Sequence, residues 1–367
     1  PEMYLWLHKD DSSFENEGST NPIAANSYRQ SQTSYGARGL LRYSIANSIV
    51  EAGAEATRQD YSFLRKALGG SLGGCLDGER PNHALSLRAE QKLYLHFVDY
   101  KISAAARRDF SSIEDQSTWR LEQSLSRSYF ADFTMGFSLG TAFSLPSLYD
   151  MYWIGDSETQ GNPNLKSEKS KGMGLWASAE HPVFDLRASY HANDIDELIQ
   201  YRQVYLFGAI WKPFNIGKAE IRNWEFEANL KPLKFLSLSG SYTLTDAKDI
   251  SLKADGTPSA TYDKLLTYTP QNRMQATFKL ADETKGLHLR FNHTGEQYST
   301  ADNLIEPLPA FDTLDAGAFF KLRIHDVELL LDMKLNNLLN KEYEIYAYIP
   351  QPGFNWSLGT SMSYKIR

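Results

Sequence analysis

Few residues of this chain have types and spacings that could support covalent chemistry. No set of Ser, His and Asp residues has a spacing typical of nucleophilic catalysis, so the sequence does not predict an enzyme. The single cysteine, Cys75, excludes an intrachain disulfide and a thiolate zinc site. The glycine-rich segment 68–74 looks like a phosphate-binding loop, but no helical pattern follows it, so it predicts a loop hinge instead.

Two groups of residues could ligate a metal. Asp10, Asp11, Glu15 and Glu17 cluster near the first expected loop and could offer oxygen ligands to calcium, although acidic loop tips are also ordinary solvated surfaces. The eight histidines are scattered, and only His83 comes close to a long expected loop, where it could be an axial haem ligand. The sequence therefore predicts no resident cofactor and leaves loop-bound calcium open.

The composition narrows the class of protein. The 367 residues carry a formal net charge of −7, so they offer no general basic surface to a nucleic acid. Hydrophobic residues make up 42%, which excludes a disordered polymer, yet no run of 18 apolar residues could form a membrane-spanning helix. Aromatic residues reach 13%. A high aromatic content without a long apolar run is typical of a wall with one apolar face and one face in water.

Apolar residues recur at every second position through most of the chain. From Phe354 to Ile366, for example, the even positions are mostly large and apolar, whereas the odd positions are small or polar. The segments 85–97, 224–230, 236–244 and 327–335 repeat this pattern. Because successive side chains of a strand point to opposite faces, each segment predicts a strand with one apolar and one polar face.

We count about sixteen such strands, and many of them are much longer than an ordinary strand. Their expected starts lie near residues 2, 33, 48, 84, 100, 117, 133, 169, 183, 217, 233, 265, 286, 309, 326 and 354. Short turns alternate with long loops, the latter near 14–32, 64–83, 145–168, 201–216, 248–264, 300–308 and 341–353. This predicts an all-β, antiparallel transmembrane barrel with periplasmic turns and extracellular loops. A soluble all-β protein, such as a propeller or a sandwich, is the alternative. A sandwich rarely needs strands this long, and the repeat near 40 residues that a propeller requires is missing.

Three motifs carry a resemblance to a known family. Phe143–Tyr152 followed by Gly161–Ser170, then Asn336–Tyr343, and finally Pro352-Gly353 before an alternating last strand resemble the signature of TonB-dependent outer-membrane receptors. Order, spacing and strand context agree from about residue 84 to the end. Asn-Pro and Pro-Gly are turn signals, and the amides of Asn336 and Asn337 can hold a loop at the end of a strand, so the motifs predict a scaffold role. Within the family, the stretch 161–250 most resembles cobalamin receptors, and siderophore and haem receptors share much of it.

The chain departs from the family pattern in its extent. Such receptors begin with a plug domain and have about 22 barrel strands. The resemblance therefore implies that residues 1–367 form the C-terminal portion of an outer-membrane β-barrel domain without the plug. Phe354 stands where the family usually has Arg, and the chain does not end on an aromatic residue.

The resemblance also implies a function and partners. A receptor of this family lies in the bacterial outer membrane among its lipids, binds a large scarce ligand such as cobalamin, a siderophore or haem, and is energised by the TonB–ExbB–ExbD complex acting through the plug. Aromatic residues of the extracellular loops are the expected ligand contacts: Tyr149, Tyr152, Trp153, Tyr205, Trp211, Tyr346 and Tyr348. They could equally belong to an aromatic girdle at the lipid headgroups or to loop packing.

Two other functions stay open at this level. A passive channel, or a structural barrel subunit of a larger assembly, would explain why no plug precedes the strands. An outer-membrane enzyme would need a Ser-His or carboxylate cluster at the rim, which the sequence does not display.

Overall fold

The computed structural model describes residues 1–15, 27–66, 72–153, 159–205, 209–215, 217–253 and 255–364. One antiparallel sheet of seventeen strands dominates it, made of sixteen main strands and the two-residue β14 (Lys264–Leu265). The main strands are β1 (Glu2–Glu15), β2 (Ser27–Ile45), β3 (Ser48–Lys66), β4 (Leu72–Leu95), β5 (Val98–Ser111), β6 (Gln116–Ser128), β7 (Asp132–Ser144), β8 (Glu168–His181), β9 (Phe184–Asp196), β12 (Lys218–Leu233), β13 (Leu236–Asp249), β15 (Asn272–Ala281), β16 (Lys285–Thr294), β17 (Phe311–Ile324), β18 (Val327–Asn336) and β21 (Asn355–Tyr364). The expectation of about sixteen strands is confirmed.

Smaller elements lie between the main strands. They are the helix α1 (Leu148–Tyr152), the hairpin of β10 (Ile199–Tyr205) and β11 (Ala209–Asn215), and the short pair β19 (Glu344–Tyr346) and β20 (Ile349–Pro350). Among the described residues, no helix has the length and apolar character needed to cross a membrane.

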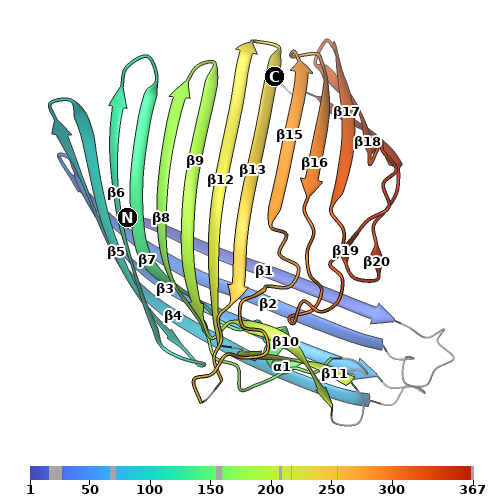
Figure 1. Ribbon diagram of the computed structural model, residues 1–367. Helices are drawn as coiled ribbons and strands as arrows, with labels where there is room; N and C mark the ends of the chain where they lie inside the picture. The colour runs from blue at the N-terminus through green and yellow to red at the C-terminus, as the bar shows by residue number, and fades with distance from the viewer. Residues whose placement is uncertain are drawn as a thin grey trace.

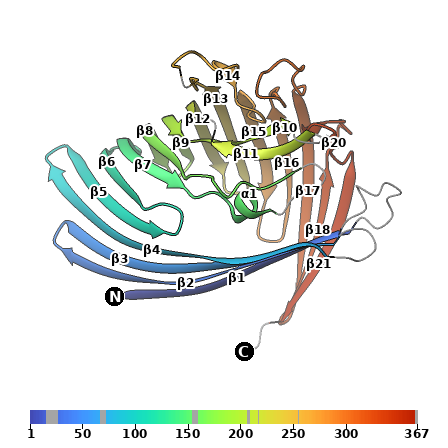
Figure 2. The same ribbon diagram turned by 90° about the horizontal axis from the view of Figure 1, so that it is seen from below.

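The main strands form a simple meander. Each pairs with the next one in sequence, and the chain skips only the small elements: β9 pairs with β12, β13 with β15, and β18 with β21. The sheet curves around a central space, with α1, β10 and β11 on its concave side (Figures 1 and 2). Tight connections such as 46–47 and 325–326 join hairpins in close register, with Ala46 and His325 at positive φ.

The alternation predicted from the sequence separates the two faces of the sheet. In β21, the large apolar residues Trp356, Leu358 and Met362 share one face and are exposed. In the neighbouring β18, Leu331 is cross-strand to Thr360 on that face, whereas Asp332 faces Gly359 on the other. Apolar side chains thus cover the convex, outer surface and polar ones cover the inner surface, as in a barrel that is surrounded by hydrocarbon.

Several strands extend further than their apolar patterns suggest. β2 begins at Ser27 rather than near 33, and β4 begins at Leu72 rather than near 84, so much of the loop expected at 64–83 is paired strand. The loop expected at 201–216 contains the β10–β11 hairpin. Backbone pairing can continue past the apolar stretch because strands that pair in water do not need an apolar face. A search for apolar periodicity therefore does not detect such extensions.

The two outermost strands are paired on one side only. β1 pairs with β2, and β21 pairs with β18; within the described ranges no ladder joins β1 to β21. These sixteen strands alone therefore do not close the wall, in agreement with the expectation that they are part of a barrel of about 22 strands. An open row of N–H and C=O groups is costly in hydrocarbon, so both edges require pairing partners beyond those that the sixteen strands provide.

Adjacent residues of β18 offer a direct test of which face meets lipid. Leu331 lies on the outer face and Leu330 on the inner face. We expect Leu331→Arg to lower the unfolding free energy of the intact protein in phospholipid vesicles by about 2–4 kcal/mol, the cost of a lipid-exposed Arg near the bilayer midplane. Leu330→Arg is the matched control and should cost clearly less. Equal losses in urea titrations of the two variants would contradict the assignment of the faces.

Candidate functional site

The candidate site lies at the end of the wall that carries the long connections. Its centre is α1, a single turn that begins after Ser147, whose hydroxyl accepts a hydrogen bond from the Asp150 backbone N–H at 2.9 Å. Leu148 and Met151 are buried, so the turn is packed against other groups rather than standing free. Figure 2 shows α1 inside the curve of the sheet.

Five aromatic residues join α1 to the inner face of β3, and we call them the mouth cluster: Tyr61, Phe63, Tyr149, Tyr152 and Trp153. Tyr61 and Tyr152 are stacked with their ring centroids 5.0 Å apart. Trp153 stacks on Tyr149 at 5.2 Å and meets Phe63 edge-on at 5.9 Å. Offset and edge-to-face aromatic pairs of this kind add to the hydrophobic stabilisation of a contact, so the cluster fixes the loop to the wall.

Arg80 ties the same loop to β4. Its guanidinium donates to the Pro146 carbonyl oxygen at 2.6 Å and, with two N–H groups, to the Gln59 side-chain oxygen at 2.9 and 2.6 Å. A planar guanidinium can hold two acceptors in fixed directions, which a lysine could not do. The start of the loop is therefore held by a directional contact from the wall.

The Gly161-Asn162 motif closes the loop. Asn162 donates from its amide nitrogen to the Pro213 carbonyl oxygen at 2.9 Å, which links the loop to β11. The backbone N–H of Gly161 donates to the Trp153 carbonyl oxygen at 3.0 Å, and a Cβ at this position would lie 2.7 Å from the Trp153 nitrogen. Only glycine fits this approach, which explains the residue and supports the scaffold role expected of the motif.

The β10–β11 hairpin completes the assembly. Tyr201 donates from its hydroxyl to an Asp150 carboxylate oxygen at 2.6 Å, and the Trp211 carbonyl oxygen accepts from the Gln160 N–H at 3.0 Å. Burial raises the pKa of Tyr201 well above its ordinary value, and the hydrogen bond to Asp150 raises it further. The hydroxyl therefore stays protonated and remains a donor across the physiological range.

The structure brings only some of the predicted ligand contacts together. Tyr149, Tyr152 and Trp153 share the mouth cluster, and Trp153 is almost fully buried. Trp211 lies on the adjoining hairpin and is partly exposed, whereas Tyr205 ends β10 and its side chain lies outside what the structure describes. Tyr346, in β19, packs on Tyr268, and Tyr348 is 90% exposed beside it, both in a separate loop.

Sequence reasoning missed the residues of the wall and of the β10–β11 hairpin that hold this site together. Tyr61, Phe63, Arg80 and Tyr201 take part, yet none was expected to do so. The sequence does place Tyr61 and Phe63 two positions apart, on the same face of one strand. Their aromatic partners, however, lie about ninety residues further along the chain. Contacts at that separation are not encoded in periodicity.

The suggested metal ligands are not grouped. Asp10 and Asp11 both lie in β1 rather than in a loop, and their alternation sends them to opposite faces. The Glu15 side chain and all of Glu17 lie outside the described residues, and His83 lies within β4. Over the described ranges there is no group of three or more His, Cys, Asp or Glu residues able to hold a metal.

The inner face of the sheet is polar, and several of its large side chains lie against the sheet. Arginine and glutamate side chains pair along it, as in Arg42–Glu51 at 2.8 Å and Arg88–Glu90 at 2.7 Å. Several large inner side chains lie flat over a glycine of the neighbouring strand: Trp176 over Gly136, His288 over Gly317 and Phe319 over Gly286. Charges are thus neutralised locally, and rings lie along the wall instead of projecting from it.

The third motif also has a structural role. Asn337 is buried with φ of 50°, donates from its amide nitrogen to the Lys341 and Pro352 carbonyl oxygens at 2.9 and 3.2 Å, and accepts from the Lys341 N–H. Asn340 accepts from the Phe354 N–H at 2.9 Å. These amides hold the last loop where it re-enters the sheet, as the sequence predicts.

An apolar outer face, a polar inner face and loops folded inward at one end define the wall of an outer-membrane transport barrel. The family model described as TonB dependent receptor-like, beta-barrel matches residues 4–338, so the chain belongs to that family. Barrels of this family reside in the bacterial outer membrane and act as transporters rather than as enzymes.

Individual relatives are distant. The chain is 27% identical over 253 residues to the vitamin B12 transporter BtuB of Vibrio vulnificus, covering 68% of this chain and 37% of that protein. It is 26% identical over 270 residues to BtuB of Photobacterium profundum, covering 73% and 40%. The chain therefore spans about two fifths of the length of these curated relatives.

Solved structures show the same fold. The copper transporter OprC superposes with a TM-score of 0.72 at 12% identity, over 99% of this chain and 62% of that one. The ferric enterobactin receptor PfeA of Pseudomonas aeruginosa, in complex with enterobactin, gives 0.71 at 18% identity, over 98% and 60%. Identities this low establish the architecture and leave the ligand undetermined.

The close approach at Gly161 gives a test of the loop anchor. Gly161→Val places branched carbons against the Trp153 backbone, and overpacking of this kind costs about 1–3 kcal/mol. We expect the contact between Gly161 and Trp153 to open more often and limited proteolysis to cleave the loop that follows β7 at least about fivefold faster. Gly39→Val is the control, because no neighbouring atom lies within 4 Å of a Cβ there. Equal cleavage of the two variants would show that the anchor is elsewhere.

Proposed function

We propose that this chain forms the wall and extracellular mouth of a TonB-dependent receptor that imports a large scarce ligand, with cobalamin as the leading candidate. The observation that carries the proposal is the assembly of α1, the β10–β11 hairpin and the mouth cluster, which folds inward at the long-loop end. Loops fixed in this way present a preformed surface to a ligand, which reduces the entropy lost on binding. The similarity to two vitamin B12 transporters favours cobalamin over other metal chelates.

Seven aromatic residues are the proposed ligand-binding set: Tyr149, Tyr152, Trp153, Tyr205, Trp211, Tyr346 and Tyr348. Within it, the exposed rings Trp211 and Tyr348 are available for direct contact. Tyr149, Tyr152 and Trp153 are largely occupied with one another and with β3, so they position the loop that meets the ligand. A corrin or a catecholate chelate has large flat surfaces, and aromatic side chains stack well on such surfaces.

The energy source is the second part of the proposal. The TonB–ExbB–ExbD complex of the inner membrane would act through a plug domain, as membership of the family implies. A passive channel or a structural barrel subunit is the rival function, favoured by the two unpaired sheet edges, which suit a wall completed by other strands.

Cyanocobalamin binding tests the ligand. We expect Trp211→Ala to weaken binding of cyanocobalamin to outer-membrane vesicles that contain the intact receptor by about tenfold, since one base-sized aromatic stack contributes about 1–3 kcal/mol. Tyr129→Ala is the control, because that exposed ring lies beside the short turn at the opposite end of β6. Absence of saturable cyanocobalamin binding, with binding of a ferric catecholate instead, would move the proposal to the siderophore class.

Dependence on the proton-motive force separates the receptor from a channel. In whole cells we expect a protonophore to abolish accumulation of the bound ligand while leaving surface binding unchanged. Diffusion through an open channel needs no such energy, so uptake that persists in the presence of the protonophore would support the passive-channel function.

A further inference from the structure

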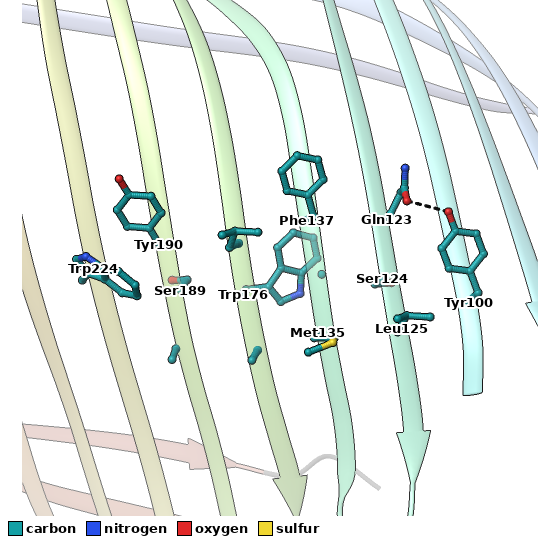
Figure 3. Close-up of a pocket in the computed structure, with 14 residues that line it drawn as sticks. Tyr100, Gln123, Ser124, Leu125, Met135, Phe137, Trp176, Ser189, Tyr190 and Trp224 are labelled. Atoms are coloured by element: carbon teal, nitrogen blue, oxygen red, sulfur yellow. Dashed lines mark hydrogen bonds between the residues drawn. The ribbon is translucent and has the colours of Figure 1, made fainter. Parts of the chain in front are cut away.

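The hollow on the outer face of the wall suits lipid rather than a polar ligand. It has a volume of about 530 Å³ and lies over β5 to β9 and β12 (Figure 3). The Tyr100 hydroxyl there donates to the Gln123 side-chain oxygen at 2.9 Å, so this polar pair is satisfied within the wall. The large outward side chains beside it, such as Phe137, Leu175 and Trp224, are apolar. Polar groups that are free to bind a ligand lie instead at the mouth.

Arg80 is a cation of the mouth that has no carboxylate partner. Its side chain is half-buried, and its acceptors are two neutral oxygens, those of the Gln59 side chain and the Pro146 carbonyl. No ion pair of Arg80 occurs among the residues that the structure describes. Burial lowers the pKa of Arg80, which is the direction expected where no neighbouring anion offsets the desolvation of the charge. The guanidinium is therefore an uncompensated positive charge in the mouth.

The acidic residues of the adjoining elements do not supply the missing anion, because each of them contacts another group. The contacts are Glu55 and Asp109 with Arg107, Asp60 and Glu79 with Arg58, Glu114 with Lys169, and Asp150 with Tyr201 and Ser147. Asp60 and Glu79 also lie on the outer face, whereas Arg80 is cross-strand to Gln59 on the inner face. The charge of Arg80 is thus left for a partner outside these elements.

Two N–H groups of Arg80 remain for such a partner. A guanidinium has five N–H donors. Its Nε and Nη2 each donate once to the Gln59 Oε1, at 2.9 and 2.6 Å, and its Nη1 donates once to the Pro146 oxygen at 2.6 Å. One N–H on Nη1 and one on Nη2 therefore have no acceptor within the described ranges. Two N–H donors on one guanidinium match the oxygens of a phosphate or carboxylate group.

The neighbours of Arg80 add a donor and no negative charge. The Gln59 oxygen faces Arg80, so the amide N–H groups of Gln59 are turned away, and they have no acceptor in the part of the chain that the structure describes. Tyr61 lies flat over Gly78, which is two positions from Arg80 on the same face of β4. Burial raises the pKa of Tyr61, and Tyr152 raises it further, so the Tyr61 hydroxyl stays neutral and does not compensate Arg80. One cation with neutral donors and no carboxylate is complementary to an anion.

From these observations we infer that Arg80 and Gln59 form a binding site for a phosphate group of the ligand. Two N–H groups of Arg80 and the amide of Gln59 donate to the phosphate oxygens. The inference rests on the proposed function in one respect, because it requires that the ligand enters the mouth. Hydrogen bonds between charged groups are stronger than neutral ones, so the site discriminates ligands that carry the anion from ligands that lack it.

A pair of corrins tests the site in outer-membrane vesicles that contain the intact receptor. Cyanocobalamin carries a phosphodiester, and dicyanocobinamide is a corrin that lacks it. We expect Arg80→Met to weaken cyanocobalamin binding by at least about tenfold, the effect of losing a hydrogen bond to a charged group, and to change dicyanocobinamide binding by less than about twofold. Arg80→Lys keeps the charge without the planar arrangement of donors, so it should give an intermediate loss of cyanocobalamin binding.

Arg58→Met is the matched control, because Arg58 lies on the outer face and pairs with Asp60 and Glu79. It should leave the binding of both corrins unchanged. Equal weakening of both corrins by Arg80→Met would show that Arg80 only positions the loop, and would overturn the inference. If Arg80→Met fails the heat-shift assay for a folded barrel, Arg80→Lys decides between the same two outcomes.

Chemical modification gives a readout that does not depend on corrin binding. Phenylglyoxal reacts with guanidinium groups, and mass spectrometry of peptides from the intact receptor follows each arginine separately. At matched ionic strength we expect inorganic phosphate to slow the modification of Arg80 by at least about fivefold relative to chloride, since a bound anion covers the guanidinium, and to leave Arg58 unchanged. Equal modification of Arg80 in the two salts would overturn the inference.

The two experiments separate the inference from the proposed function. If neither corrin binds but phosphate protects Arg80, cobalamin is the wrong ligand and the site for a phosphate group stands. If phosphate protects Arg80 but Arg80→Met weakens both corrins equally, the site belongs to a free anion rather than to the ligand, and the inference is overturned.

Discussion

Hydrocarbon cannot hydrogen-bond to a peptide group, and the organisation of this molecule depends on that constraint. It requires ladders that run without interruption through the apolar band, and the sixteen main strands provide fifteen neighbouring pairings in sequence order. It also divides the side chains: outward positions such as Leu331 are left to lipid, while inward positions hold paired charges and glycines. The same constraint makes the unpaired backbone groups along the free edges of β1 and β21 costly wherever they meet hydrocarbon.

Beyond the apolar band the strands lie in water and their side chains need not be apolar on either face, and the mouth is formed by these extensions. There β3 and β4 continue as a ladder in water, and they offer Tyr61, Phe63 and Arg80 as a docking surface for the loop that follows β7. The Gly161-Asn162 turn then connects this loop to the β10–β11 hairpin. A family motif that looks like a ligand signature in the sequence is thus largely the means by which one loop is secured.

Much of the wall could be predicted from the sequence. The physical reason is that a strand with one face in lipid requires an apolar residue at every second position. Strand number, face assignment and the scaffold role of Asn337 followed from local patterns. The extent of β2 and β4 and the β10–β11 hairpin could not be predicted in this way, because strands that pair outside the membrane do not need alternating apolar residues. The mouth cluster could not be foreseen either, since it joins residues of β3 to α1 through curvature of the whole sheet.

The glycines of the inner face have a consequence for the size of the passage. Trp176, His288 and Phe319 lie flat because the residue opposite each has no side chain. A single methyl group at Gly136, Gly317 or Gly286 would tip the neighbouring ring toward the axis and narrow the bore on that side. The contour of the inner surface at these three places therefore depends on the glycines as much as on the rings that cover them.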